Sequence, residues 1–184
     1  HVLAELREDT ASLPPEFHQT TWCADRAIDF ICEKREYPWL MSVNIFDPLS
    51  PFDPPREYLE RYDPGMLPDP LWSDKDPLAH EMLGPVDGAT SIDLDQAKEV
   101  LAAYYAMIEL IDDNVGRMLQ TLEESGQRED TLVIFTSDHG ELVGDHQLVG
   151  KGCRFYESLV RVPLICSWPG QVREGVICDA LVEL

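Results

Sequence analysis

The longest hydrophobic pattern in the chain predicts one long amphipathic helix within residues 93–125. Apolar side chains recur there every three or four positions, the spacing that places them on one helix face. They are Leu101, Tyr104, Ile108, Ile111, Val115, Leu119 and Leu122. Ser91 or Asp93 can cap the start, and Gly126 can close the end. At about 1.5 Å per residue, roughly thirty residues make a helix about 45 Å long.

A shorter helix is predicted near the start of the chain. It begins at Thr20 or Thr21, either of which can act as the N-cap, and runs to about Arg35. Its helically spaced apolar positions are Trp22, Ala27, Ile28 and Ile31. Residues 1–18 contain Pro14-Pro15 and show little periodicity, so we expect a connector there.

Runs of β-branched or aromatic residues bounded by turn residues predict strands near 39–46, 131–136 and 162–167. The uninterrupted run 133–136 is typical of a strand covered on both faces, as in parallel sheets. A short helical stretch around 155–159 precedes the last strand. We therefore expect an α/β fold with a mainly parallel sheet flanked by helices.

A proline-rich stretch separates the first predicted strand from the long helix. Nine of the 14 prolines lie between Asp47 and Pro85. Proline has no backbone N–H and a restricted φ, so we expect a long irregular region over 47–90. Loops of this length in compact domains usually carry function, and we expect this one to border the functional site.

Composition limits the class of protein. With 184 residues and 44% hydrophobic residues, the chain can bury one sizeable core, so one domain is the default. A net charge of -21 argues against binding nucleic acid or anionic lipid, since both require basic patches. No apolar run is long enough to span a membrane, and the first residues lack the features of a signal peptide. Without an initiator methionine, and ending within an apolar stretch, the chain is expected to be a segment of a longer protein.

The 5 cysteines form no C-x-x-C pair, and their odd number disfavours a complete disulfide framework. We expect buried free thiols. Cys153 could serve as a nucleophile, but the sequence provides no base for it, so a packed thiol is the better interpretation.

The candidate chemistry follows the strand predicted at 131–136. Asp138 and His139 come directly after it, where open α/β sheets place their functional residues, and Gly140 allows a sharp turn. Both side chains could then reach one metal ion from a rigid support. A turn in which Asp138 only binds nearby backbone amides is the alternative interpretation. A glycine-flanked Lys151 further on makes the pattern longer than a turn requires.

Three common motifs do not account for this region. The gap from Gly144 to Gly150 holds five residues instead of the four of a phosphate-binding loop, and Gly152 after the lysine has no hydroxyl. Neither the H-E-x-x-H spacing of a zinc protease nor the acidic spacing of an EF-hand is present.

Several motifs occur in a fixed order: Thr136-Ser137-Asp138-His139-Gly140-Glu141, Gly144-Asp145-His146, Lys151-Gly152, Arg161-Val162-Pro163-Leu164-Ile165 and Pro169-Gly170. In this order they resemble the sulfatase family of the alkaline phosphatase superfamily. Tyr104, Ile111-Asp112 and Gly116-Arg117 resemble the family's long helix, and the run from Phe46 to Phe52 resembles its Pro-His-x-Pro-Phe loop. The resemblance covers roughly residues 39–175. It implies that residues 1–184 are part of an alkaline-phosphatase-like sandwich domain.

By this resemblance, Asp138 and His139 bind a divalent cation, usually calcium, and Lys151 contacts the sulfate. A metal and a lysine both offset the charge of ester oxygens. Imidazole is a poor ligand for calcium, which leaves manganese or zinc as alternatives. Glu141 is interpreted as a helix-start residue or as a support for the ligands. A solvated surface lysine is the alternative for Lys151.

The chain departs from the family pattern in two respects. The nucleophile motif C/S-x-P-S-R, whose first residue becomes formylglycine, and the upstream acidic pair are absent. Both normally precede the stretch where this chain begins. Leu49 stands in place of a histidine, and leucine donates neither a hydrogen bond nor a proton. His146 or His80 could replace that histidine, although His146 could equally bond only within its own loop.

The expected function is therefore that of a segment of a metal-dependent sulfuric ester hydrolase, inactive when isolated. Its substrate would be a sulfated small molecule or carbohydrate. The alternatives are a phosphonate monoester or phosphodiester hydrolase, or a non-catalytic metal- or carbohydrate-binding relative. Only the family resemblance indicates a location, which would be periplasmic or secreted, and the oligomeric state stays open.

Overall fold

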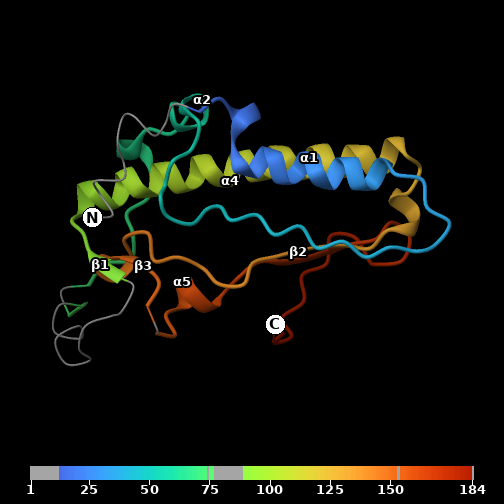
Figure 1. Cartoon of the computed structure of the whole chain (residues 1–184). Helices are drawn as coiled ribbons and strands as arrows, with labels where there is room; N and C mark the ends of the chain where they lie inside the picture. The colour runs from blue at the N-terminus through green and yellow to red at the C-terminus, as the bar shows by residue number, and fades with distance from the viewer. Residues whose placement is uncertain (1–12, 74, 77–88, 153, 184) are drawn as a thin grey trace.

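The computed structural model describes residues 13–73, 75–76, 89–152 and 154–183. Its largest element is the helix α4 (Leu94–Glu124), which confirms the predicted long helix. The Asp93 carboxylate accepts a hydrogen bond from the Gln96 backbone N–H, while the Gln96 side chain accepts one from Asp93. This reciprocal cap sets the start of the helix. Figure 1 shows α4 running along most of the length of the molecule.

The first helix, α1 (Gln19–Cys32), packs against α4 through Ala24, Ala27 and Ile31 on its buried face. The predicted N-cap is wrong, because the extended His18 caps the helix and accepts from the Thr20 backbone N–H at 3.4 Å. Thr20 instead lies buried in the first turn, where its hydroxyl donates to Asp47. The helix also ends before the predicted Arg35.

The described part of the predicted irregular region is pinned to α4. Between residues 47 and 73 it contains only the short helix α2 (Arg56–Leu59) and the 3-10 helix η3 (Pro64–Met66). Phe52, 3% exposed, packs in the core cluster on α4. The Tyr58 hydroxyl donates to the Asp113 carboxylate at 2.7 Å. These contacts hold the loop along the helix. Residues 1–12 and 77–88 of the predicted connector and loop lie outside the described residues.

The predicted parallel arrangement is wrong for the described strands. β2 (Val133–Thr136) pairs with β4 (Leu164–Ser167), and β1 (Ala89–Ser91) pairs with β3 (Leu148–Gly150), both antiparallel. The chain returns from β2 to β4 through loops and a helix of only 4 residues, α5 (Glu157–Val160). Residues 137–163 are long enough for the crossover that parallel neighbours require, so the antiparallel direction follows from how this segment packs and not from its length. The fold class α/β is retained.

The strands predicted near 131–136 and 162–167 are confirmed as β2 and β4, but the strand predicted at 39–46 is wrong. That segment is extended, and its residues alternate between exposed and half-buried without being assigned to a strand. β-Favouring residues produce an extended chain, whereas a ladder also needs a partner in register. The prediction that 133–136 is covered on both faces is wrong too, because Ile134 is 57% exposed.

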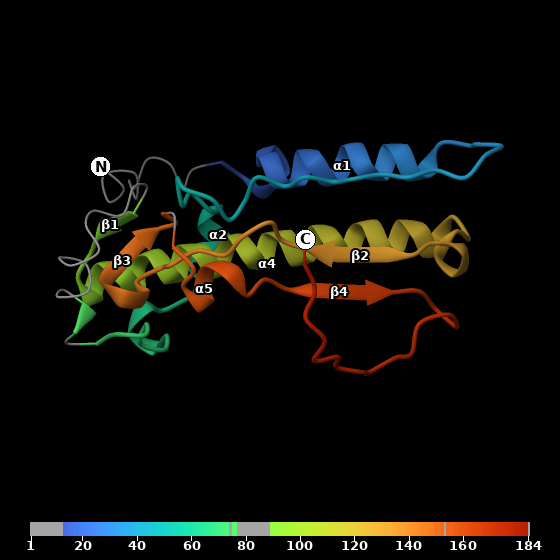
Figure 2. The same ribbon diagram turned by 90° about the horizontal axis from the view of Figure 1, so that it is seen from below.

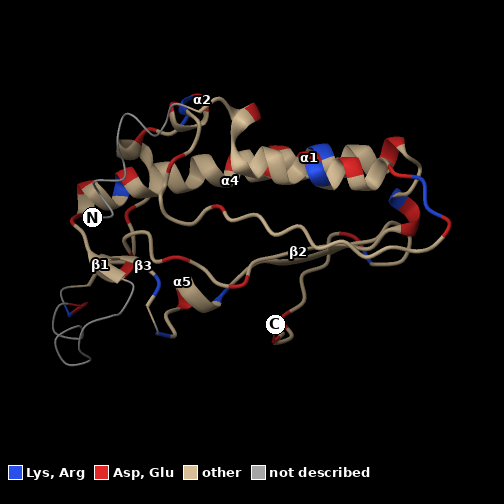
Figure 3. Cartoon of the chain, viewed as in Figure 1, with Lys and Arg blue, Asp and Glu red and all other residues tan. Residues whose placement is uncertain are grey.

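The first half of α4 packs in one core cluster with Phe52, Ile92 and Val149, and Figure 2 shows β1 and β3 beside this end of the helix. Leu142, Leu148 and Leu159 form a buried cluster that joins the loop after β2 to β3 and α5. Acidic residues outnumber basic ones by 35 to 14 and are spread over both long helices and the loops (Figure 3). No described helix is long and apolar enough to cross a membrane.

The cysteine prediction is confirmed in part. Cys23, Cys32, Cys166 and Cys178 are free thiols, but Cys23 is half-buried and the other three are exposed, so the expected burial is wrong. Cys153 lies outside the described residues.

Candidate functional site

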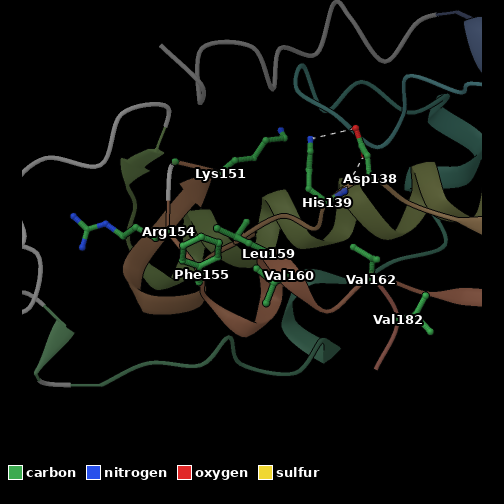
Figure 4. A pocket seen from close by; sticks show the side chains of 10 residues that line it. Asp138, His139, Lys151, Arg154, Phe155, Leu159, Val160, Val162 and Val182 are labelled. Carbon is green, nitrogen blue, oxygen red and sulfur yellow. Dashed lines mark hydrogen bonds and ion pairs between the residues drawn. The ribbon is translucent and has the colours of Figure 1, made fainter. Parts of the chain in front are cut away.

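A pocket of about 590 Å³ lies beyond the carboxyl end of β2 (Figure 4). It brings together Asp138, His139 and Lys151, as the sequence predicted. The other lining residues come mainly from the segment around α5: Gly152, Arg154, Phe155, Leu159, Val160, Val162 and Val182. A carboxylate, an imidazole and an ammonium group therefore face one cavity with an otherwise largely apolar wall.

The His139 ring is oriented by its own backbone. Its Nδ1 lies 2.8 Å from the Gly140 carbonyl oxygen, which can only accept, so the neutral ring carries its proton on Nδ1. Nε2 then keeps its lone pair, as a metal ligand requires. The Asp138 carboxylate accepts from the His139 backbone N–H at 2.9 Å and places its other oxygen, Oδ2, 3.9 Å from Nε2.

This pair fits one side of a metal shell. Two ligand atoms at about 2.4 Å from one ion, as around calcium, can lie about 4 Å apart, which is close to the 3.9 Å between Oδ2 and Nε2. The side chains of Asp138 and His139 are 86% and 46% exposed, so both can reach an ion. A complete shell needs at least about four ligands. The described residues contain no cluster of three or more His, Cys, Asp or Glu placed for a metal, so this pair supplies only part of one.

Gly140 anchors the pair to α5. Its backbone N–H donates to the Leu159 carbonyl at 2.8 Å, and a Cβ at this position would lie 1.9 Å from the Ser158 carbonyl oxygen. Only glycine permits this approach of two backbones. The contact fixes the path of the chain immediately after the candidate metal ligands.

The Lys151 ammonium pairs with the buried carboxylate of Glu141, a contact that sequence reasoning missed. Its ammonium donates to Glu141 Oε2 at 2.9 Å, and the Leu142 backbone N–H donates to Oε1 at 3.0 Å. The Glu141 side chain is 4% exposed and that of Lys151 is 28% exposed. Burial and, next, the Glu141 charge raise the pKa of Tyr104 to about 12. Glu141 does not begin a helix, which corrects one of its two predicted roles.

A tight turn between these partners returns Lys151 to Glu141. The backbone N–H groups of Leu142 and Gly144 donate to the carbonyls of Gly150 and Leu148. Gly144 has a φ of 104°, and a Cβ there would lie 2.6 Å from the Ala97 side chain on α4. Three further residues have positive φ despite their side chains: Val143, His146 and Gln147. Packing against α4 thus supports a strained turn that no local sequence signal specified.

His146 contacts residues that do not line the pocket. Its ring stacks on Tyr156 with 4.3 Å between centroids, and Nδ1 lies 3.3 Å from Asp76 Oδ1. Its backbone N–H donates to the Leu71 carbonyl at 2.7 Å. It is not one of the residues lining the pocket. Within the described chain it joins the 71–76 segment to the residues before α5, so the geometry does not support the predicted catalytic role.

The loop expected on the rim of the pocket is also placed elsewhere. Residues 48–52, including Leu49, are absent from the pocket lining. Phe52 is held in the core on α4, which draws this end of the loop away from a solvent-facing rim. His80 lies outside the described residues.

The described α/β fold thus gathers a carboxylate, an imidazole and a lysine ammonium at one pocket. The family model described as Sulfatase matches residues 5–182. The chain belongs to the sulfatase family, within the alkaline phosphatase superfamily.

The relatives include both sulfatases and phosphonate hydrolases. An arylsulfatase of Clostridium perfringens is 34% identical over 176 residues, covering 91% of this chain and 36% of that protein. The multifunctional alkaline phosphatase superfamily protein PehA of Trinickia caryophylli is 30% identical over 192 residues, covering 95% and 37%. A solved phosphonate monoester hydrolase of Agrobacterium radiobacter gives a TM-score of 0.75 at 29% identity, covering 86% and 34%. The chain spans about a third of each of these relatives.

Proposed function

We propose that this chain supplies one side of the active site of a metal-dependent sulfuric ester hydrolase acting on a sulfated small molecule or carbohydrate. The observation that carries the proposal is the convergence of Asp138, His139 and Lys151 on one pocket. The arylsulfatase relative supports sulfate-ester chemistry. A formylglycine nucleophile, as the family resemblance implies, would come from outside this chain.

Asp138 and His139 would hold a divalent cation, calcium by family resemblance or else manganese or zinc. When bound, the cation supplies positive charge against the ester oxygens. The Asp138 carboxylate contributes a charged oxygen ligand, and the protonated Nδ1 of His139 keeps Nε2 available to the same ion. Neither residue needs to transfer a proton in this role.

Lys151 would bind the sulfate. An ammonium group has three N–H donors, of which one is engaged by Glu141, so two can donate to sulfate oxygens. As negative charge grows on those oxygens in the transition state, these hydrogen bonds strengthen. Removing one such donor typically reduces turnover by about a hundredfold, equivalent to about 3 kcal/mol.

A second candidate function is hydrolysis of phosphonate monoesters or phosphodiesters. Two features favour it: the imidazole of His139 as a candidate metal ligand, and the likeness to the solved phosphonate monoester hydrolase. A third, non-catalytic function as a metal- or carbohydrate-binding relative is favoured by Leu49, which cannot donate a proton.

Turnover by the full-length protein separates these functions. Matched aryl sulfate, aryl phosphonate monoester and aryl phosphodiester substrates are compared after chelation and again after adding calcium, manganese or zinc. We expect the sulfate ester to react fastest and Lys151→Ala to slow it about a hundredfold. The control is Lys98→Ala, which removes a lysine paired with Asp69 at 2.6 Å outside the pocket lining.

The other outcomes decide against the sulfatase proposal. Faster turnover of the phosphonate or the diester supports the second function. Absence of turnover of every ester, combined with retained metal binding, supports the non-catalytic function. The isolated 184-residue chain is expected to be inactive, because its sequence has no formylglycine motif and its described residues contain no complete group of metal ligands.

A further inference from the structure

We infer that Glu141 is a positioning residue that holds the Lys151 ammonium at the pocket, an inference that rests on the proposed function. Glu141 itself is not part of the pocket lining, whereas Lys151 is. The carboxylate therefore acts on the substrate only through the lysine.

Burial makes the pairing of these two side chains strong. Only 4% of the Glu141 side chain is exposed, so its carboxylate has exchanged most of its hydration for protein contacts. A buried charge is stable only when it is paired and hydrogen-bonded. The ammonium of Lys151, at 2.9 Å, meets both requirements. This pair is more shielded from solvent than an exposed surface ion pair, whose partners separate readily.

The carboxylate is also held in orientation by the backbone. Oε1 accepts from the Leu142 backbone N–H, which it shares with the Gly150 carbonyl oxygen, and the Leu142 side chain is fully buried in the cluster with Leu148 and Leu159. On the other side, Gly140 is docked on α5. Oε2 therefore presents a fixed acceptor to Lys151, as a well-supported site requires.

A fixed acceptor limits the positions of a flexible side chain. Lysine has a long stem and loses considerable rotamer freedom when it is held in one place. Figure 4 shows the Lys151 side chain extended towards His139, with its nitrogen on the side of the candidate metal ligands. Because Glu141 sets this direction before substrate arrives, the remaining two donors face the place where the sulfate would bind.

A double-mutant cycle in the full-length protein tests the inference. The variants are Glu141→Gln, Lys151→Ala and the double variant, assayed on an aryl sulfate with the metal held constant. We expect Glu141→Gln to lower kcat at least about tenfold, with a smaller change in KM, because a misplaced donor loses transition-state contacts. Since Glu141 acts through Lys151, the double variant should match Lys151→Ala within about twofold.

Further measurements separate positioning from folding. Glu141→Asp keeps the charge but shortens the side chain, so its kcat should fall between those of the wild type and Glu141→Gln. Thermal unfolding of every variant identifies any loss of structure, and Glu123→Gln removes an exposed carboxylate on α4 as the matched control. Inorganic sulfate, titrated by calorimetry, should bind about tenfold more weakly to Glu141→Gln, independently of turnover.

The outcomes distinguish the inference from the proposed function. If Lys151→Ala slows turnover but Glu141→Gln leaves kcat and sulfate binding unchanged, the inference fails and the function stands. If the two losses multiply in the double variant, Glu141 has a separate structural role and the inference is again overturned. If Lys151→Ala has no effect, the proposed function fails together with it.

Discussion

Asp138 and His139 are more exposed than Glu141 and Lys151, an ion pair of which only the lysine lines the pocket. The side chains of Asp138 and His139 are 86% and 46% exposed, whereas those of Glu141 and Lys151 are 4% and 28% exposed. The first pair is held mainly by its own backbone, and the second is held across a turn packed on α4. The Glu141–Lys151 pair is thus the more firmly held of the two, whereas the described residues contain no group of three or more His, Cys, Asp or Glu placed to hold a metal.

The largest effect is expected from Asp138→Ala in the full-length protein. It removes the charged member of the candidate metal pair, and turnover of an aryl sulfate should fall on the order of a thousandfold. Bound metal should decrease in parallel, as measured by elemental analysis after dialysis. Asp112→Ala, at an exposed position on α4, is the control. Unchanged metal content and turnover would show that Asp138 is no ligand.

Gly140→Ala should damage the link between both sides of the pocket. The new Cβ would overlap the Ser158 carbonyl, and shifting that backbone should cost about 1–3 kcal/mol of unfolding free energy. Gly116→Ala is a matched control because its Cβ meets nothing within 4 Å, and alanine in a helix should stabilise by up to about 1 kcal/mol. Denaturant unfolding measures both. Equal stabilities would contradict the close approach at Gly140.

His146→Asn should reduce stability more than turnover. Asparagine tolerates the positive φ at this position but loses the stacking on Tyr156, which is worth about 1 kcal/mol. Turnover should change less than about threefold, whereas loss of a general acid or base costs at least about a hundredfold. Steady-state kinetics and unfolding curves of the same variant test this prediction. A hundredfold loss of kcat at unchanged stability would instead indicate that His146 is catalytic.

The smallest effect concerns the titration of Tyr104. Its pKa is raised to about 12, so the folded state holds the phenol proton to a higher pH than the unfolded chain does. The resulting contribution of Tyr104 to the free energy of unfolding is complete below about pH 10. It is lost as the pH rises through about 12. Glu141→Gln should lower the pKa of Tyr104, because it removes the second cause of the shift after burial. Ultraviolet titration measures this change.

Tyr58 provides the internal reference for that experiment. Burial and its hydrogen bond to Asp113 raise its pKa to about 12, without Glu141 as a cause. It should therefore titrate identically in the wild type and in Glu141→Gln. An unchanged pKa of Tyr104 in Glu141→Gln would show that the Glu141 charge does not influence this side chain on α4.

Features that depend on neighbouring residues were predicted well. The long helix was expected within 93–125 and is found at Leu94–Glu124, because its apolar spacing and the Asp93 cap are local. The segment 39–46 is extended as its composition favours, but pairing depends on a partner remote in sequence. The direction of β2 against β4 likewise depends on how the intervening chain packs.

The functional site likewise combines features set by neighbouring residues with contacts between remote segments. Asp138 and His139 are adjacent in sequence, so their common direction follows from the strand and the turn. The pairing of Glu141 with Lys151 required a strained turn supported by Ala97 on α4, and that of His146 with Asp76 joins segments 70 residues apart. No spacing rule marks such contacts in the sequence.

The two main helices, the family and three residues that meet at the pocket could be predicted from the sequence. The antiparallel pairing, the burial of Glu141 and the position of His146 away from the pocket are set by the folded structure. Helix formation and motif chemistry depend on residues a few positions apart. Strand direction, burial and side-chain partners depend on packing between distant segments, which one-dimensional patterns do not specify.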